Sequence, residues 1–101
     1  MATYRGMKIR TQQGGMVVKK DDDILSPKPS QKLYNYSDGF NWGYGGSGPA
    51  QLALALLLDV TGDKDIALGN HQQFKWAIVA KFEDEWQITT KEIKAWLQRT
   101  K

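Results

Sequence analysis

The feature that most constrains this fold is an apolar stretch near the middle of the chain. Within "AQLALALLLD", residues 50–59, only Gln51 and Asp59 are polar. Alanine and leucine are strong helix formers, so the stretch predicts a helix over about residues 48–61, with Gly62 at its end. A helix that is apolar on every face must be covered on every face, because its leucines would otherwise remain in water. We therefore expect this helix at the centre of the core.

A cluster of glycines and aromatic residues leads into the helix. "GYGGSG" satisfies the G-x-G-x-x-G pattern of dinucleotide-binding proteins at Gly43, Gly45 and Gly48. That site also needs a buried strand before the glycines and repeated βαβ units, whereas the preceding "NYSDGFNW" is polar and interrupted by glycine. The phosphate-binding loop of nucleotide hydrolases is excluded as well, since no lysine follows the glycines.

Two interpretations of this junction stay open. In the first, the glycines allow tight turns and let the aromatic side chains pack against the helix, with Ser47 as the N-cap. In the second, the backbone N–H groups of residues 45–50 form an anion-binding concavity aided by the helix dipole, although Pro49 removes one donor. The candidate ligand-binding residues are Trp42, Tyr44, Gly45, Gly46, Ser47, Gly48 and Gln51.

Positive charge gathers in the first third of the chain. Residues 1–33 hold seven Lys or Arg and three Asp, whereas residues 34–101 hold seven Lys or Arg and eight acids. Residues 4–20, "YRGMKIRTQQGGMVVKK", predict two strands joined by a glycine turn. This hairpin is either a solvated strand face or a contact for a partner protein or nucleic acid, although nucleic-acid binders usually carry denser cations. The candidate contact residues are Arg5, Lys8, Arg10, Lys19 and Lys20.

The segments on either side of the central helix carry weaker signals. Residues 21–32, "DDDILSPKPSQK", predict a loop, because acids, prolines and polar residues interrupt any period. Residues 34–44 place five aromatic residues at even positions, which predicts an extended segment or a short hairpin. These aromatic residues either cover the central helix or form a stacking surface for bases or sugars. Residues 63–73 predict a short helical turn or loop.

The C-terminal part predicts two strands and a helix. Residues 74–82, "FKWAIVAKF", alternate as a strand, with Lys75 and Lys81 on one face and, on the other, Phe74, Trp76, Ile78, Ala80 and Phe82. Residues 86–89, "WQIT", predict an antiparallel return strand. A capping box at Thr89 and Glu92 starts an amphipathic helix.

Taken together, these segments predict one α+β domain over residues 1–101. We expect a small antiparallel sheet, made of the N-terminal hairpin and the strands near 74–82 and 86–89, around the buried helix at about 48–61. An amphipathic helix at about 90–100 follows, with an outer face of Lys91, Lys94, Arg99 and Lys101.

Several function classes are disfavoured by composition. The chain has no cysteine and a single histidine, His71, which lies in polar "GNHQQ" and is expected to be exposed. "GGSGP" departs from the G-x-S-x-G nucleophile pattern. We therefore expect no enzyme, no catalytic residue, no metal site and no cofactor. The longest apolar run, residues 52–58, is shorter than the roughly 20 residues of a membrane span, and no signal peptide is apparent, so a cytoplasmic location is expected.

A family resemblance rests mainly on "FNWGYGGSGPAQLALALLLD", residues 40–59. This stretch resembles the domain-of-unknown-function 6166 family of small bacterial and phage proteins, and its signature covers residues 42–51. A looser similarity extends over residues 74–97, where that family likewise has a strand, a tryptophan, a threonine cap and a helix with a late tryptophan. The resemblance implies a bacterial cytoplasmic or mobile-element context and no known activity.

The favoured hypothesis is a small non-enzymatic protein of phage or mobile-element type that acts by protein–protein contact. One form it would take is an inhibitor of a host defence complex, of the anti-CRISPR kind. The alternatives are an anion or nucleotide-type ligand binder at the glycine-rich helix start, and a weak nucleic-acid binder through the basic hairpin. The oligomeric state is left open.

Overall fold

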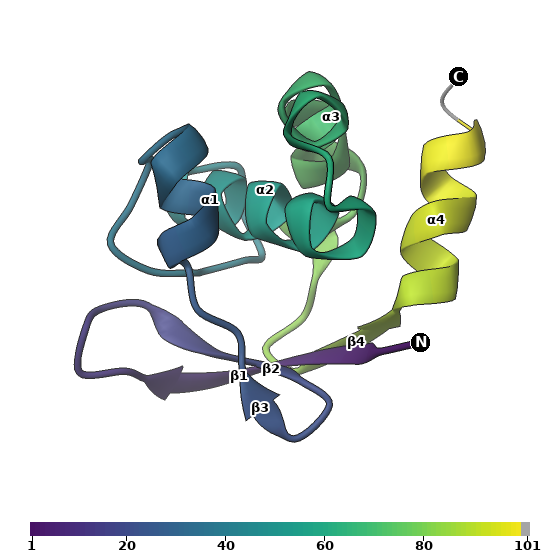
Figure 1. The fold of residues 1–101 in the computed structure, drawn as a ribbon. Coiled ribbons are helices and arrows are strands. Elements are labelled where there is room, and N and C mark those ends of the chain that lie inside the picture. The colour runs from purple at the N-terminus through teal and green to yellow at the C-terminus, as the bar shows by residue number, and fades with distance from the viewer. Residues whose placement is uncertain (100–101) are drawn as a thin grey trace.

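The fold is α+β, as predicted, and the computed structural model describes residues 1–99. Four strands form one antiparallel sheet, and helices cover one of its faces (Figure 1). In chain order, the elements are β1 (Thr3–Arg10), β2 (Met16–Lys20), β3 (Asp23–Ile24), α1 (Lys28–Leu33), α2 (Ser47–Thr61), α3 (Lys64–Ala77), the 3-10 helix η1 (Val79–Lys81), β4 (Trp86–Thr89) and α4 (Thr90–Arg99).

The strand order in the sheet is β3-β2-β1-β4. The predicted N-terminal hairpin is confirmed, with Tyr4 opposite Lys20 and Met7 opposite Val17. Gly14 and Gly15, at the end of the hairpin, have φ values of 107° and 76°, a conformation that glycine adopts at little cost. The predicted strand at residues 86–89 is also present, but it pairs with β1.

Helix α2 occupies the core, as its apolar sequence predicts. Residues 48–57 are all buried, and Leu52, Leu54, Leu56 and Leu57 have no solvent-exposed surface. Burial of these four side chains contributes roughly 6–12 kcal/mol before the entropy cost of folding. Gly62 ends the helix in the left-handed conformation, and its N–H donates to the Leu58 carbonyl at 2.8 Å.

The prediction of a strand at residues 74–82 is wrong, because this segment is helical. Helix α3 runs to Ala77 and η1 follows it. Helix α3 also replaces the short turn or loop predicted at residues 63–73. The helix starts at an N-cap, Asp63, whose side chain accepts hydrogen bonds from the N–H groups of Asp65 and Ile66. The alternating apolar residues that indicated a strand are divided between the last turns of α3 and the η1 segment.

Two further segment predictions need correction. The predicted loop at residues 21–32 contains β3 and most of α1, and Pro29 is accommodated in the first turn of that helix.

Residues 34–44 form no hairpin, and their one sheet-like contact is an isolated bridge between Phe40 and Met16. Instead, the buried Gln51 amide of α2 holds the start of this segment. Its Oε1 accepts from the N–H groups of Tyr36 and Ser37 at 2.7 and 3.1 Å.

Helix α4 begins as predicted. The N–H of Glu92 donates to Thr89 Oγ1 at 3.1 Å, and Glu92 Oε1 accepts from the N–H of Thr89 at 3.0 Å, which forms the capping box. Ile93 and Leu97 are buried against the core. The predicted helix end at residue 100 and the basic residue Lys101 lie outside the described residues. Within residues 1–99, no helix combines the length and apolar character that a membrane crossing requires.

Candidate functional site at the glycine-rich junction

Three of the predicted ligand-binding residues are buried and stabilise the fold. Trp42 is 1% exposed, and its indole N–H donates to the Asp84 carbonyl at 3.2 Å. Gly48 packs so closely that a Cβ there would lie 2.7 Å from the Cβ of Asn41. The Gln51 side chain is fully buried and forms four hydrogen bonds within the protein. These three residues are therefore not available to a ligand.

The other predicted residues lie at the surface, where a residue from α3 joins them. Tyr44 is 49% exposed and Trp76 is 59% exposed. A Cβ at Gly45 would overlap the Trp76 ring, and a Cβ at Gly46 would lie 2.5 Å from the Tyr44 ring. The two glycines are therefore required for these rings to lie against the backbone. We call this set, Tyr44, Gly45, Gly46, Ser47 and Trp76, the aromatic–glycine surface.

The strand prediction placed Trp76 on the same face as Phe74 and opposite Lys75, and that prediction is wrong. Because the segment is a helix, the chain rotates by about 100° per residue, and Trp76 turns outward while its neighbour Lys75 turns inward. Only the helical period of α3, read through His71, Phe74 and Lys75, could have revealed this exposed tryptophan.

Lys75 is a buried cation beside this surface. Its ammonium lies 4.5 Å from the centroid of the Trp76 ring and donates to the Gly45 carbonyl at 3.3 Å. Among residues 1–99, the only ion pair within 4 Å joins Lys20 and Asp59, so no carboxylate neutralises Lys75 at that distance. The ammonium is stabilised by the tryptophan ring and by a backbone carbonyl.

The predicted N-cap at Ser47 is also corrected. Gly46 is the N-cap residue, and no side chain bonds the first turn of α2. The N–H of Ala50 donates to the Gly46 carbonyl at 3.1 Å. Since Pro49 has no N–H, only Ser47 and Gly48 can offer backbone donors at this helix start.

The five hairpin cations do not form one patch. Lys20 pairs with Asp59 of α2 at 2.9 Å, and the same carboxylate accepts the Tyr4 hydroxyl at 2.5 Å. Burial, reinforced by the hydrogen bond to Asp59, raises the pKa of the Tyr4 hydroxyl. Lys8 donates to the side-chain oxygen of Asn41 at 2.6 Å. Two of the five cations are thus engaged within the protein.

The helices lie on one face of the sheet and leave the other face uncovered (Figure 1). The strand register places two other hairpin cations on the uncovered face. Arg5 lies directly opposite Lys19 across β1 and β2, and Gln87 flanks Arg5 on β4. Side chains alternate along a strand, so these residues project away from the helices. Arg10 pairs with Met16 after a shift in register, at the far end of the hairpin.

His71 is buried and hydrogen-bonded, contrary to the expectation that it is exposed. Its Nδ1 lies 2.8 Å from the Leu68 carbonyl, and its Nε2 lies 2.7 Å from the Tyr36 hydroxyl. Because a carbonyl can only accept, Nδ1 carries a proton, and in the neutral ring Nε2 then accepts from the Tyr36 hydroxyl. The same hydroxyl accepts from the Gln72 amide at 3.0 Å. His71 therefore links α3 to the chain before α2.

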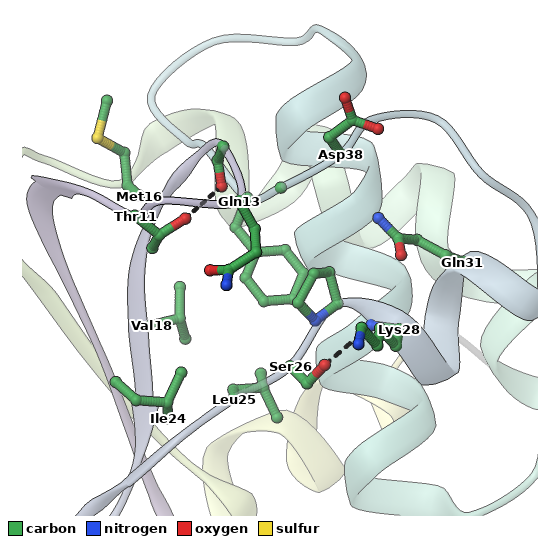
Figure 2. Close-up of a pocket in the computed structure, with 14 residues that line it drawn as sticks. Thr11, Gln13, Met16, Val18, Ile24, Leu25, Ser26, Lys28, Gln31 and Asp38 are labelled. Atoms are coloured by element: carbon green, nitrogen blue, oxygen red, sulfur yellow. Dashed lines mark hydrogen bonds between the residues drawn. The ribbon is translucent and has the colours of Figure 1, made fainter.

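A pocket lies between the hairpin and α1 (Figure 2), and no pattern in the sequence predicted it. It has a volume of about 380 Å³. The segment that forms one of its walls was expected to be a loop, so no signal pointed to an enclosed space there. Its apolar lining residues are Met16, Val18, Ile24, Leu25, Pro27 and Phe40.

Within the described residues, no group of three or more His, Cys, Asp or Glu is placed to hold a metal ion. No curated protein and no solved structure matches the chain. A family model, described as a family of unknown function (DUF6166), matches residues 4–99. This match covers the glycine-rich junction, all four helices as far as residue 99, and nearly the whole sheet. The chain therefore belongs to the DUF6166 family, as the resemblance at residues 40–59 indicated.

Proposed function

We propose that this protein is a non-enzymatic binding protein that acts by protein–protein contact through the aromatic–glycine surface. The observation that carries the proposal is the exposure of Trp76 and Tyr44 on two adjacent glycines. Tryptophan and tyrosine are enriched among the residues that dominate interface energies. A partner that covers both rings would remove a large apolar area from water.

The surface is also preorganised. The Trp76 ring rests on Gly45 and is held by the Lys75 ammonium, so its orientation is set before a partner arrives. Side chains that are already ordered lose less rotamer freedom on binding, which leaves more of the contact energy for affinity. The fixed orientation of Trp76 therefore supports the proposal that its ring contacts a partner.

We further propose that the protein is of phage or mobile-element type and acts in the bacterial cytoplasm. In this proposal it inhibits a host defence complex by occupying a contact surface of one component. The support is the family resemblance carried by residues 40–59.

The proposal is tested by affinity capture from bacterial lysate with matched variants. We expect Trp76→Ala to abolish capture of a partner that the unaltered protein retains. Leu68→Ala removes an exposed apolar side chain from the same helix, outside the aromatic–glycine surface, and should leave capture intact. Equal capture by both variants, or no partner for the unaltered protein, would count against the proposal.

An anion binder at the start of α2 is the second candidate. It is favoured by Lys75, a buried ammonium without a carboxylate within 4 Å among residues 1–99, which contacts the carbonyl just before the helix. Uncapped N–H groups and the helix dipole would add to the attraction for an anion. Titration with inorganic phosphate and nucleotides, followed by NMR, should then shift the amides of residues 45–48. Shifts confined to other regions would rule this candidate out.

Nucleic-acid binding through the hairpin is the weakest of the three candidates. Lys8 and Lys20 are engaged within the protein, which leaves Arg5, Arg10 and Lys19 as the hairpin charges that favour it. A mobility shift that weakens with salt and is lost in Lys19→Gln would support this candidate. The absence of any shift at low salt would reject it.

A further inference from the structure

The pocket between the hairpin and α1 is built from three separate segments. These are the hairpin end, the connection from β3 into α1, and residues 38–40 (Figure 2). Its volume of about 380 Å³ lies near the lower limit of ligand sites, which run from roughly 300 to 1,000 Å³. A single amino acid or a molecule of similar size fits such a space better than a nucleotide.

Hydrogen bonds between the walls hold the pocket in shape. The N–H of Met16 donates to the Phe40 carbonyl at 2.8 Å, and the N–H of Leu25 donates to the Val18 carbonyl at 2.8 Å. On the opposite side, the Gln31 amide donates to the Ser37 carbonyl at 2.9 Å. Each wall is therefore tied to a neighbour, and the pocket exists before any ligand binds.

The inner part of the pocket is apolar. Val18 and Phe40 are almost completely buried, and Leu25 and Pro27 are half-buried beside them. In Figure 2, Val18 and Leu25 lie deep between the hairpin and the chain that enters α1. These side chains form a surface against which an aliphatic or aromatic group can pack.

The rim carries one cation and one anion with no partner. Among residues 1–99, no hydrogen bond or ion pair engages the Lys28 ammonium or the Asp38 carboxylate. Lys28 lies at the start of α1, whereas Asp38 lies beside the hairpin turn, where a Cβ on Gly14 would be 3.6 Å from the Asp38 Cβ. Gln31 lies between the two residues in Figure 2. The Gln31–Ser37 hydrogen bond ties the helix that carries Lys28 to the segment that carries Asp38. Both charged residues thus line the same partly apolar pocket.

We propose that this pocket binds a free α-amino acid with a large apolar side chain. The ammonium group of the ligand would pair with Asp38, its carboxylate with Lys28, and its side chain would pack on Val18, Leu25 and Phe40. A zwitterion satisfies both charges at once, whereas a purely cationic or anionic ligand would leave one of them unmatched. The pocket shares no residue with the aromatic–glycine surface, so this inference stands apart from the proposed function.

The test is a titration of the protein with L-leucine and L-phenylalanine, followed by the NMR shifts of its backbone amides. We expect the amides of the lining residues to shift with a Kd on the order of 1 mM or below. Lys28→Gln and Asp38→Asn should each weaken binding about fivefold, as expected for one partly exposed ion pair. Both residues are exposed, so the variants should keep the amide spectrum of the folded protein.

Lys32→Gln and Asp22→Asn serve as matched controls, since they remove the same charges at exposed positions outside the pocket. N-acetyl-leucine lacks the ammonium group and leucinamide lacks the carboxylate, so both should bind more weakly than leucine. Alanine should bind more weakly because it cannot fill the apolar part. The proposal is overturned if leucine and phenylalanine shift no amide of the lining residues. It is also overturned if the pocket variants and the control variants weaken binding equally. Binding of N-acetyl-leucine, leucinamide or alanine as tightly as leucine would overturn it as well.

Discussion

At the scale of single residues, one carboxylate connects the sheet to the central helix. Asp59 on α2 accepts the Tyr4 hydroxyl from β1 and pairs with Lys20 on β2. Burial and the neighbouring carboxylate both disfavour the ionised phenol, so the pKa of Tyr4 is raised in the folded protein.

A pH dependence follows from this raised pKa. In the unfolded chain Tyr4 ionises near pH 10, whereas in the folded protein it keeps its proton to higher pH. The stability that Tyr4 contributes is therefore fully present below about pH 10 and is lost as the pH rises toward the folded pKa. Urea unfolding at about pH 8 and pH 10.5 should show a larger loss for the unaltered protein than for Tyr4→Phe. Parallel losses in the two proteins would contradict the assignment.

Gln51 is the second residue whose role is specific enough to test. Gln51→Met keeps the approximate size of the side chain but leaves the N–H groups of Tyr36 and Ser37 without their acceptor. We expect it to lower the free energy of unfolding by about 2–4 kcal/mol. Two fully buried donors without a partner cost about 2–6 kcal/mol together, and Tyr36 and Ser37 are only half-buried. Gln73→Met, on the exposed side of α3, should change it by less than about 0.5 kcal/mol. Urea denaturation of both variants measures these changes. Similar losses of free energy of unfolding in Gln51→Met and Gln73→Met would refute this role of Gln51.

At the scale of elements, the sheet retains a repulsive pair on its uncovered face. Arg5 and Lys19 lie directly opposite one another, and like charges in such positions destabilise a sheet. Arg5→Glu converts the repulsion into an attraction across the strands, so it should raise the free energy of unfolding by roughly 0.2–1 kcal/mol at low salt. Arg5→Gln should give a smaller increase. The gain should shrink at high salt, and an unchanged or lowered stability would show that the pair does not interact.

Which elements could be predicted depended on whether their signal was local. The hairpin with its glycine turn, α2 and the capping box of α4 each follow from neighbouring residues. Helix α3 could not be recognised from residues 74–82 alone, since alternating apolar residues suit either a strand or the end of an amphipathic helix. The local signal that indicates this helix is its N-cap residue, Asp63, which lies outside that segment. Helix α1 was hidden because its prolines resemble those of a loop.

The candidate site was predictable only in part for the same reason. The glycines and Tyr44 belong to one continuous stretch, so their proximity follows from the sequence. Trp76 and Lys75 reach the junction through the packing of α3 on α2, a contact between segments about 30 positions apart that no local pattern contains. The pocket likewise depends on three segments meeting.

At the scale of the whole molecule, the helices lie on one face of the sheet, and three surfaces are built from separate sets of residues. These are the aromatic–glycine surface, the uncovered face of the sheet and the pocket beside α1. The apolar α2 lies inside, and its glycine-rich entrance emerges beside α3, where packing exposes Tyr44 and Trp76. The uncovered face of the sheet and the pocket beside α1 are built from other residues. Substitutions of the exposed Tyr44 and Trp76 should therefore affect the proposed partner binding without disturbing the rest of the fold.

The most direct test of the proposed contact is hydrogen exchange, measured for the protein alone and for its complex with the captured partner. Slower exchange at the amides of residues 43–47 in the complex is the predicted result, with little change at the hairpin end around residues 11–16. Unchanged exchange at residues 43–47, with protection confined to the strands or the hairpin, would contradict it.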